Sequence, residues 1–210
     1  MLTVGLAGGI ASGKSLVASQ FELLGAKALN ADRLGHDVLR DEVVIDEIEH
    51  ALGSVLDSTG QLDRKVIAEI VFEQSDQAKQ KLAALEKITH PRIKKKIIAC
   101  IEQYRNEDYP AAVLDAPVMF KSGWDRLCDK IVFVRADVEV RLQRAIKRGW
   151  SEQHFHQRES SQTPIDVKFS KATDVIDNNK GLQDTNHQVR QLWEKWDLPP
   201  LPNNLWGNKA

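Results

Sequence analysis

"GGIASGKSL", residues 8–16, directly follows an apolar run at residues 3–7. The stretch matches the phosphate-binding pattern G-x-x-x-x-G-K-[ST] at Gly8, Gly13, Lys14 and Ser15. Glycines let the backbone curl so that successive N–H groups point toward one anion. A helix expected from about Lys14 adds the partial positive charge of its N-terminus. Chance would place these residue types at this spacing in roughly one chain in a hundred of this length. The sequence therefore predicts a nucleotide-binding loop.

Composition limits the class of protein. The chain has 210 residues, 42% hydrophobic and 28% charged, which fits one globular domain and excludes wholesale disorder. A formal net charge of −1 gives no broad basic surface for nucleic acid. Cys100 and Cys128 lie in no metal-binding or redox motif. No apolar run reaches the ~18 residues of a membrane span and no basic leader is evident. We therefore expect a soluble cytoplasmic protein that binds neither nucleic acid nor membrane.

Apolar runs alternate with helical patterns along the chain. The runs that predict buried strands are Thr3–Ala7, Ala26–Leu29, Ala111–Pro117, Lys130–Ala136 and Asp174–Asn179. Helical spacing is expected at Ser15–Leu24, over most of Leu34–Arg105, at Val138–Arg148 and at Val189–Trp196. The long second stretch is expected to break at Gly53–Asp63 and at Thr89–Pro91. This alternation predicts an α/β fold with a parallel sheet of about five strands covered on both faces.

Three kinds of nucleotide-binding protein compete at this point. A switch GTPase needs a guanine-selecting [NT]-K-x-D motif, which is absent, and "DSTG" at Asp57–Gly60 lies between helical segments, where it is interpreted as a turn. A nucleic-acid ATPase lacks its basic surface here. A small-molecule kinase needs an acid near the acceptor, a second acid near the metal, and arginines for the transferring phosphoryl group. The sequence offers candidates for both acids and for the arginines, which favours the kinase.

Six segments together resemble the dephospho-CoA kinases. They are "VGLAGGIASGKS" (Val4–Ser15), "LNAD" (Leu29–Asp32), "GQLDR" (Gly60–Arg64), "LEKITHPRI" (Leu85–Ile93), "VLDAPVMF" (Val113–Phe120) and "KATDVIDNN" (Lys171–Asn179). The resemblance covers about residues 2–195. It implies ATP-dependent phosphorylation of the ribose 3′-hydroxyl of dephospho-CoA, the last step of coenzyme A synthesis, with Mg²⁺. Two alternatives stay open: a P-loop kinase for a nucleoside or nucleotide acceptor, and a nucleotide-binding regulator that has lost phosphoryl transfer.

The resemblance also implies an organisation of the chain. We expect one three-layer P-loop kinase unit over residues 1–196, followed by an irregular tail at 197–210. Its core comprises about 1–33, 108–137 and 172–196, its helical substrate-binding part about 34–107, and its lid about 138–171. The expected state is a monomer or a weak homo-oligomer.

Site residues follow from the motif and the resemblance. ATP is expected to contact Gly8, Gly9, Ile10, Ala11, Ser12, Gly13, Lys14, Ser15, Leu16, Arg148 and Asn178. Lys14, a catalytic candidate, can reach the β- and γ-phosphates, and the Ser15 hydroxyl can ligate Mg²⁺. Asp115 closes an apolar strand and is expected to order the water shell of the metal; a turn residue before Pro117 is the alternative. Asp32, the catalytic base implied by the resemblance, would accept the proton of the attacking hydroxyl; capping a helix is the alternative.

Further candidates come from the basic helix and the loops. Arg144 and Arg148 lie one turn apart, and the resemblance places them in the lid, with Arg144 catalytic; a solvated basic face is the alternative. Arg141 is a weaker candidate. Asn178 is expected near the adenine because it follows the last strand. Two candidates are expected to be structural: Asp63–Arg64 as an internal ion pair and His90 as part of a break.

Three positions depart from the family pattern. Leu16 replaces the usual Thr and removes one hydrogen bond to an α-phosphate oxygen, so we expect weaker ATP binding with activity kept. Asn30 replaces an Asp, and Lys121 replaces a Glu, which reverses a charge on the substrate side. The regulator alternative rests on these three changes together.

Overall fold

The computed structural model describes residues 1–73 and 75–199. Two compact units divide the chain: Met1–Asn30 together with the described residues from Cys100 on, and Ala31–Ala99. We call them the sheet unit and the helical unit. Helix α5 (Asp76–Asn106) spans the boundary in the sequence. Of the predicted irregular tail at 197–210, residues 200–210 lie outside the described residues.

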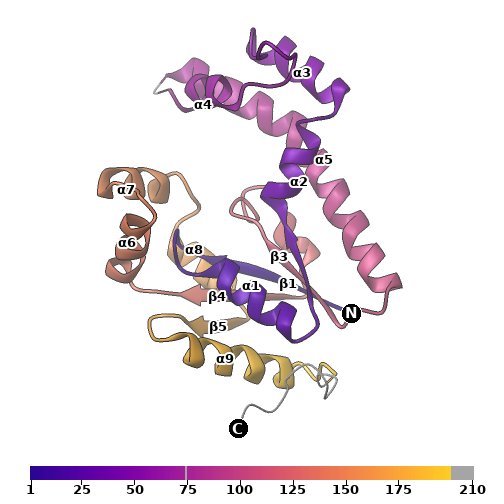
Figure 1. Ribbon diagram of the computed structural model, residues 1–210, viewed down its shortest axis with the longest axis vertical. Coiled ribbons are helices and arrows are strands. Elements are labelled where there is room, and N and C mark those ends of the chain that lie inside the picture. Colours follow the sequence, from indigo (N-terminus) through magenta and orange to yellow (C-terminus); the bar gives the residue numbers. More distant parts are fainter. Residues whose placement is uncertain (74, 200–210) are drawn as a thin grey trace. The chain divides into compact units, whose positions relative to one another are not determined.

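The sheet unit is built on five parallel strands in the order β2-β3-β1-β4-β5 (Figure 1). The strands are β1 (Leu2–Gly8), β2 (Lys27–Asn30), β3 (Ala111–Asp115), β4 (Lys130–Arg135) and β5 (Asp174–Asp177). Each corresponds to one of the predicted apolar runs. Because all strands run the same way, their carboxyl ends share one edge, where ligands bind in folds of this kind. The candidate phosphate loop follows β1, the central strand.

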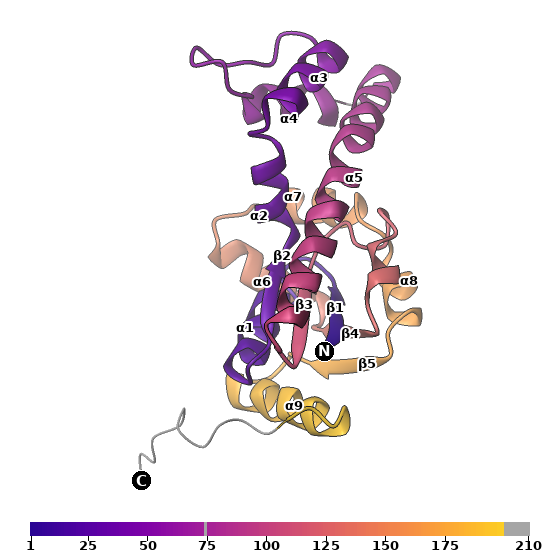
Figure 2. The same ribbon diagram turned by 90° about the vertical axis from the view of Figure 1, so that its right-hand side faces the viewer.

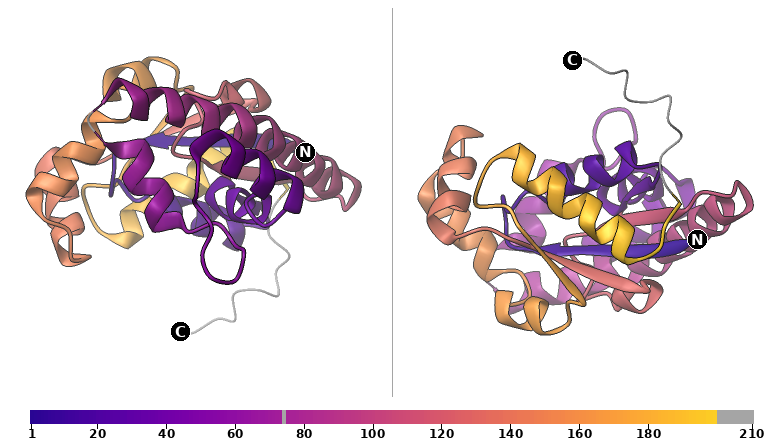
Figure 3. Two further views of the ribbon diagram at one scale, coloured as in Figure 1. Left: turned by 90° about the horizontal axis from the view of Figure 1, so that it is seen from above. Right: turned by 90° about the horizontal axis from the view of Figure 1, so that it is seen from below.

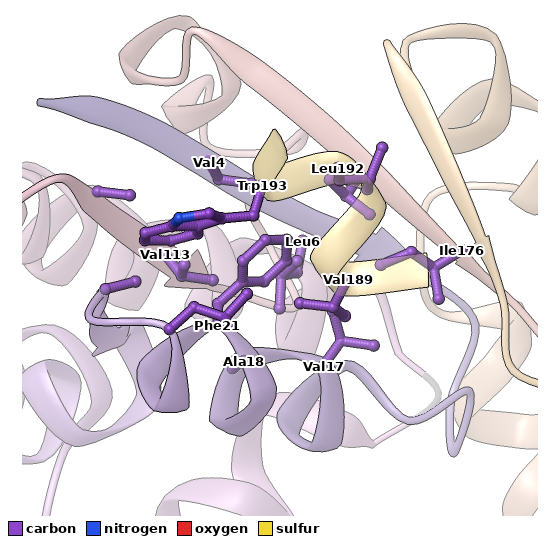
Figure 4. Close-up of a cluster of buried hydrophobic side chains, with 14 of the residues drawn as sticks. Val4, Leu6, Val17, Ala18, Phe21, Val113, Ile176, Val189, Leu192 and Trp193 are labelled. Carbon is purple, nitrogen blue, oxygen red and sulfur yellow. The ribbon is translucent and has the colours of Figure 1, made fainter. Parts of the chain in front are cut away.

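Helices α1 (Lys14–Leu23) and α9 (Leu182–Lys195) cover one face of this sheet. Figure 4 shows Phe21 of α1 beside Trp193 and Val189 of α9, over Leu6 of β1, all of them nearly or fully buried. The ring centroids of Phe21 and Trp193 are 6.4 Å apart. In Figures 2 and 3, α9 (yellow) lies along the sheet, as its predicted apolar stripe requires.

The opposite face is covered by α8 (Ile165–Ser170) and by the segment around the 3₁₀ turn η1 (Trp124–Leu127). A Cβ at Gly5 would lie 2.8 Å from the sulfur atoms of both Met119 and Cys128, so a larger residue there would force these side chains to shift. Burial raises the pKa of the Cys128 thiol to about 12, so the thiol stays neutral. Phe169 of α8 packs edge-on against Phe133, with centroids 5.3 Å apart. Helices on both faces complete the predicted three layers.

Helices α6 (Val138–Lys147) and α7 (Glu152–Ser160) follow β4. The prediction of a helix in the basic stretch is confirmed. The polar segment after it forms α7 and α8. The fully buried Phe155 of α7 faces Arg141 of α6, whose guanidinium lies 5.6 Å from the ring.

The helical unit contains α2 (Ala31–Val38), α3 (Glu42–Leu52), α4 (Arg64–Phe72) and the first part of α5. Its buried core includes Val44, Ile48, Val55, Ile67, Val71 and Ile97. The predicted break at 53–63 is a loop closed by an antiparallel bridge between Leu56 and Leu62. Within it Asp57 accepts hydrogen bonds from the backbone and hydroxyl of Thr59 and from the Gln61 amide, which lower its pKa. The interpretation of "DSTG" as a turn is confirmed.

The predicted break at Thr89–Pro91 is wrong, because α5 runs through Pro91 without interruption. Proline removes one backbone donor and usually ends or kinks a helix. Here side chains add hydrogen bonds beside it: Thr89 Oγ1 donates to the Leu85 carbonyl (2.8 Å) and Arg92 Nη1 to the Ile88 carbonyl (2.8 Å). Arg92 also pairs with Glu47 of α3 at 2.7 Å. These contacts hold the helix on both sides of the proline.

The expected ion pair of Asp63 with Arg64 is also wrong. The Asp63 carboxylate instead caps α4, accepting hydrogen bonds from the amides of Lys65 (2.9 Å) and Val66 (3.2 Å). The Arg64 guanidinium contacts the ring of His36 in α2. Both residues keep the expected structural role within the helical unit, by different contacts.

Candidate active site

The loop Gly8–Leu16 connects β1 to α1 and has the backbone of an anion nest. Gly8 and Gly13 have φ angles of 146° and 101°, and Ala11 has 56°, so the loop repeatedly enters the left-handed region. The Ser12 amide donates to the Gly9 carbonyl at 3.3 Å, which closes the turn. Gly13 is the N-cap of α1 and has no capping side chain. An uncapped helix start of this kind suits an anionic ligand.

The Lys14 side chain folds back over this loop. Its ammonium donates to the carbonyls of Gly9 (3.0 Å) and Gly8 (3.4 Å). Both acceptors belong to the loop that would surround a phosphate. The ammonium therefore lies where a short movement can transfer it to phosphate oxygens.

Two side chains far along the sequence hold the Ser12 carbonyl. Asn178 Nδ2 donates to it at 2.7 Å and Arg144 Nη1 at 3.3 Å. Asn178 is 2% exposed, and its own Oδ1 accepts from the hydroxyl of Thr185 at 2.8 Å. A Cβ at Gly13 would overlap the Asn178 amide, which is a second reason for glycine there. Asn178 supports the loop through the Ser12 carbonyl. Its expected place near the adenine stays a prediction.

A buried ion pair holds the Ile10 backbone on the other side of the loop. Glu159 of α7 accepts a hydrogen bond from the Ile10 amide at 3.1 Å, and Arg141 of α6 donates to the Ile10 carbonyl at 3.4 Å. Glu159 and Arg141 are themselves 2.6 Å apart. A Cβ at Gly9 would overlap the Arg141 guanidinium. Arg141 therefore supports the loop, a role that its predicted position near the face of Arg144 did not indicate.

The two residues predicted to serve a metal lie together. The Ser15 hydroxyl donates to Asp115 Oδ2 at 3.1 Å. The register of β2 on β3 sets Asn30 opposite Asp115. Among the described residues no three His, Cys, Asp or Glu side chains gather into a metal site. The protein thus offers an oxygen pair that needs ligands from elsewhere.

Arg144 and Arg148 lie one helical turn apart at the end of α6. Besides Ser12, Arg144 donates to the Asn178 carbonyl at 2.8 Å. Burial and the nearby charge of Arg148 lower the pKa of Arg144. Arg148 is the C-cap of α6 and is exposed. The predicted pair thus splits, with Arg144 held at the loop and Arg148 facing solvent.

The remaining predicted residues are placed by the chain itself. Asp32 is exposed in the first turn of α2, two residues after β2 ends. Leu16 is half-buried in the first turn of α1, and Lys121 is exposed. Their functional roles stay predictions.

Two residues at the loop were missed by the sequence reasoning, Glu159 and Lys168. Both lie in the polar stretch after the basic helix, where no motif distinguishes them from exposed charges. Lys168 is 3% exposed and donates to the Gly8 carbonyl. Lys168 is the buried residue of α8, whose other residues are exposed, and no signal in the sequence marks it.

A parallel sheet of this order, with a phosphate loop after its central strand, defines a P-loop nucleotide-binding protein. A sequence model of the dephospho-CoA kinase family matches residues 2–184. Dephospho-CoA kinases of Aquifex aeolicus and Symbiobacterium thermophilum are 39% and 38% identical to the chain. The alignments cover 95% and 92% of this chain and 100% and 80% of those proteins. The chain belongs to the dephospho-CoA kinase family.

Solved structures agree with this assignment. Dephospho-CoA kinase from Campylobacter jejuni matches with a TM-score of 0.68 at 27% identity, covering 92% of this chain and 96% of that one. A Thermus thermophilus crystal structure matches with a TM-score of 0.78 at 27% identity, covering 92% and 97%. Shikimate kinase from Acinetobacter baumannii, 17% identical with a TM-score of 0.51, covers 95% and 96% and shares the fold.

These findings confirm the predicted family, the α/β P-loop fold with its five-stranded parallel sheet, and the prediction of a kinase that phosphorylates dephospho-CoA with ATP. Within residues 1–73 and 75–199, no helix is both long and apolar enough to cross a membrane.

Proposed function

We propose that the chain transfers the γ-phosphoryl group of ATP to the ribose 3′-hydroxyl of dephospho-CoA, and that the predicted site residues carry out this transfer. The observation that supports the proposal most strongly is the loop around Lys14, whose ammonium donates to the carbonyls of Gly8 and Gly9. Side chains hold the backbone of this loop at Ile10 and Ser12. It has the residue types and the shape that a triphosphate needs.

ATP binds with its phosphates inside the loop Gly8–Leu16. The amides at the start of α1 donate to phosphate oxygens, and the helix dipole favours the negative charge. Lys14 moves from the two loop carbonyls to the β- and γ-phosphates. Arg144, held beside Ser12, and Arg148 stabilise the charge on the transferring group with their forked donors.

Ser15 and Asp115 fit Mg²⁺. Both offer hard oxygen atoms, which this ion prefers, and the hydroxyl and carboxylate are already 3.1 Å apart. Mg²⁺ commonly takes only one or two protein ligands and completes its shell with phosphate and water. When bound, the ion neutralises charge that develops on the phosphate oxygens.

Asp32 accepts the proton of the acceptor. As the 3′-oxygen forms its bond to the γ-phosphorus, its proton passes to the Asp32 carboxylate. The bond from the γ-phosphorus to the bridging oxygen breaks, and ADP leaves with that electron pair. Asp32 is exposed at the start of α2, so its carboxylate is accessible for this role.

The helical unit offers surfaces for the acceptor. A largely apolar cavity of about 250 Å³ is lined by Leu39, Ile67, Leu85 and Ile93, and Arg64 also lines it. A second cavity of about 240 Å³ is lined by His36, Arg40 and Arg64. Cationic side chains beside an apolar surface suit a substrate that joins phosphates to an uncharged arm.

The test is release of ADP by the purified chain with Mg·ATP and a panel of acceptors. Release with dephospho-CoA alone is the expected result. Release with a nucleoside or nucleotide instead would replace this proposal by another kinase, and nucleotide binding without turnover would replace it by a regulator.

A matched pair of variants tests the base. Asp32→Asn should lower kcat by about 10²–10⁴, the usual contribution of a positioned base, with ATP affinity unchanged. Asp37→Asn, an exposed aspartate of the same helix, is the control and should keep full activity. Equal activity of both variants would remove Asp32 from the mechanism. The cytoplasmic location and the monomeric or weakly oligomeric state stay predictions.

A further inference from the structure

Lys168 is a buried lysine that the mechanism above does not use. It lies in α8 and is 3% exposed, although lysines usually keep their ammonium in water. Its Nζ donates to the Gly8 carbonyl at 3.3 Å and to Gln162 Oε1 at 2.7 Å. Both acceptors are neutral, and no carboxylate in the described part of the chain bonds to it. A buried charge without an ionic partner is costly unless a ligand supplies one.

The Gly8 carbonyl accepts from two ammonium groups, Lys168 at 3.3 Å and Lys14 at 3.4 Å. Like charges that share one acceptor repel each other, and this repulsion is relieved when an anion enters between them. The nearby charges of Arg141 and Glu159 largely cancel in their 2.6 Å ion pair. The two lysines thus place two ammonium groups at the start of the loop.

The space beside these lysines adjoins the metal-side strand. A hollow of about 10 Å³ is lined by Lys14, Lys168 and Pro117, and Pro117 follows Asp115 by two residues. The ammonium of Lys168 thus lies on the side of the loop where β3 ends.

The protonation of Lys168 is sensitive to its surroundings. Burial and the charge of Lys14 lower its pKa to about 8, Glu159 opposes this shift, and Arg141 adds to it. An anion bound at the lysine would raise this pKa again. At neutral pH the group is mainly the ammonium, and it becomes neutral as the pH rises through about 8.

We propose that Lys168 is a second phosphate-binding cation of the active site, which moves from the Gly8 carbonyl to an oxygen of the γ-phosphate when ATP binds. It shares that phosphate with Lys14 and stabilises the charge of the group being transferred. The proposal rests on the proposed function for the identity of the nucleotide, and its test does not require the acceptor.

The test compares affinities for ADP and for an ATP analogue with a non-hydrolysable γ-phosphate, both with Mg²⁺, by calorimetry. Lys168→Met should weaken analogue binding about 10- to 100-fold, as expected for loss of one charged hydrogen bond, and ADP binding by less than about threefold. Lys168→Arg should retain most of the preference for the triphosphate. Lys171→Gln is the control, because Lys171 is exposed and pairs with Asp125 at 3.1 Å; it should change neither affinity.

Equal weakening of both ligands by Lys168→Met would overturn the proposal, because it would assign Lys168 a purely structural role in holding the loop. Unchanged binding of both ligands would also overturn it. Since a methionine beside Gly8 can prevent folding, the same ratio is measured on the unaltered protein between about pH 7 and about pH 9.

The preference for the triphosphate should fall as the pH rises through about 8 in the unaltered protein, and stay constant in Lys168→Arg, whose guanidinium keeps its charge. A constant ratio in the unaltered protein would contradict the proposal. Turnover of a different acceptor would refute the proposed function and leave this ratio intact, so the two failures are distinguishable.

Discussion

The ion pair of Arg141 and Glu159 gives a quantitative test of how the phosphate loop is held. The two side chains are 4% and 21% exposed and lie 2.6 Å apart. Arg141→Met preserves much of the packing but leaves the carboxylate unpaired, and it removes the donor to the Ile10 carbonyl. Breaking a buried pair from one side costs about 3–5 kcal/mol. Water can reach Glu159 in part, so we expect the lower end, about 3 kcal/mol.

Glu159→Gln should destabilise the protein less than Arg141→Met does. Its amide oxygen can still accept from Arg141, but the charge is lost and the Ile10 amide loses its acceptor, which costs about 1–3 kcal/mol. The double variant should cost less than the sum of the single variants by at least about 1 kcal/mol, because the partners contact each other directly. Both single variants should also raise the KM for ATP, since the loop they hold binds the phosphates.

Urea unfolding of the unaltered protein, the two single variants and the double variant measures these free energies of unfolding, and the slope of each transition is checked. Lys79→Met is the control, because Lys79 pairs with Asp76 at the surface and should cost less than about 1 kcal/mol. If Arg141→Met matched this control, or if the two single changes were additive, the pair would not brace the loop and the reasoning would be refuted.

Three further predictions concern other parts of the sheet unit. Asn178→Ala should destabilise the protein by about 1–3 kcal/mol and weaken ATP binding, because Ser12 loses a donor; unfolding and ATP titration test this, and unchanged affinity would contradict it. Leu16→Thr should tighten ATP binding about 10- to 100-fold in the same titration, and equal or weaker binding would refute it. Burial acts to raise the pKa of Asp174, but the Lys195 ion pair and the Thr173 hydrogen bond lower it below 3.8. The charged Asp174 therefore stabilises the protein above that pH, and this stabilisation is lost as the pH falls through the lowered pKa. The unfolding free energies of the wild type and Asp174→Asn should therefore converge at acid pH, and a constant difference would contradict this.

Much of the fold was predictable because its signals are local. A parallel strand buried on both faces must be apolar in its interior, and β3 and β4 show this directly, with charged residues only at their ends. The phosphate loop was predictable because its chemistry fixes residue types at fixed spacing. Pro91 misled the prediction, because a local rule was overridden by Thr89 and Arg92.

The supports of the loop were not predictable, because burial of a charge depends on distant packing. Glu159 contacts a residue 149 positions away, and Lys168 one 160 positions away. In the sequence each is one charged residue among many. Arg141 was predicted as a lesser phosphate ligand, and only its contact with Ile10 reveals its role.

The hydrogen bond from Asn178 to the Ser12 carbonyl spans 166 positions of the chain. During synthesis the phosphate loop leaves the ribosome 166 residues before the amide that fixes its shape. Ordered contacts of such long separation form late and slowly. The nascent chain therefore carries an incomplete nucleotide site until Asn178 has emerged, and ATP can assist folding of the completed loop only after that point.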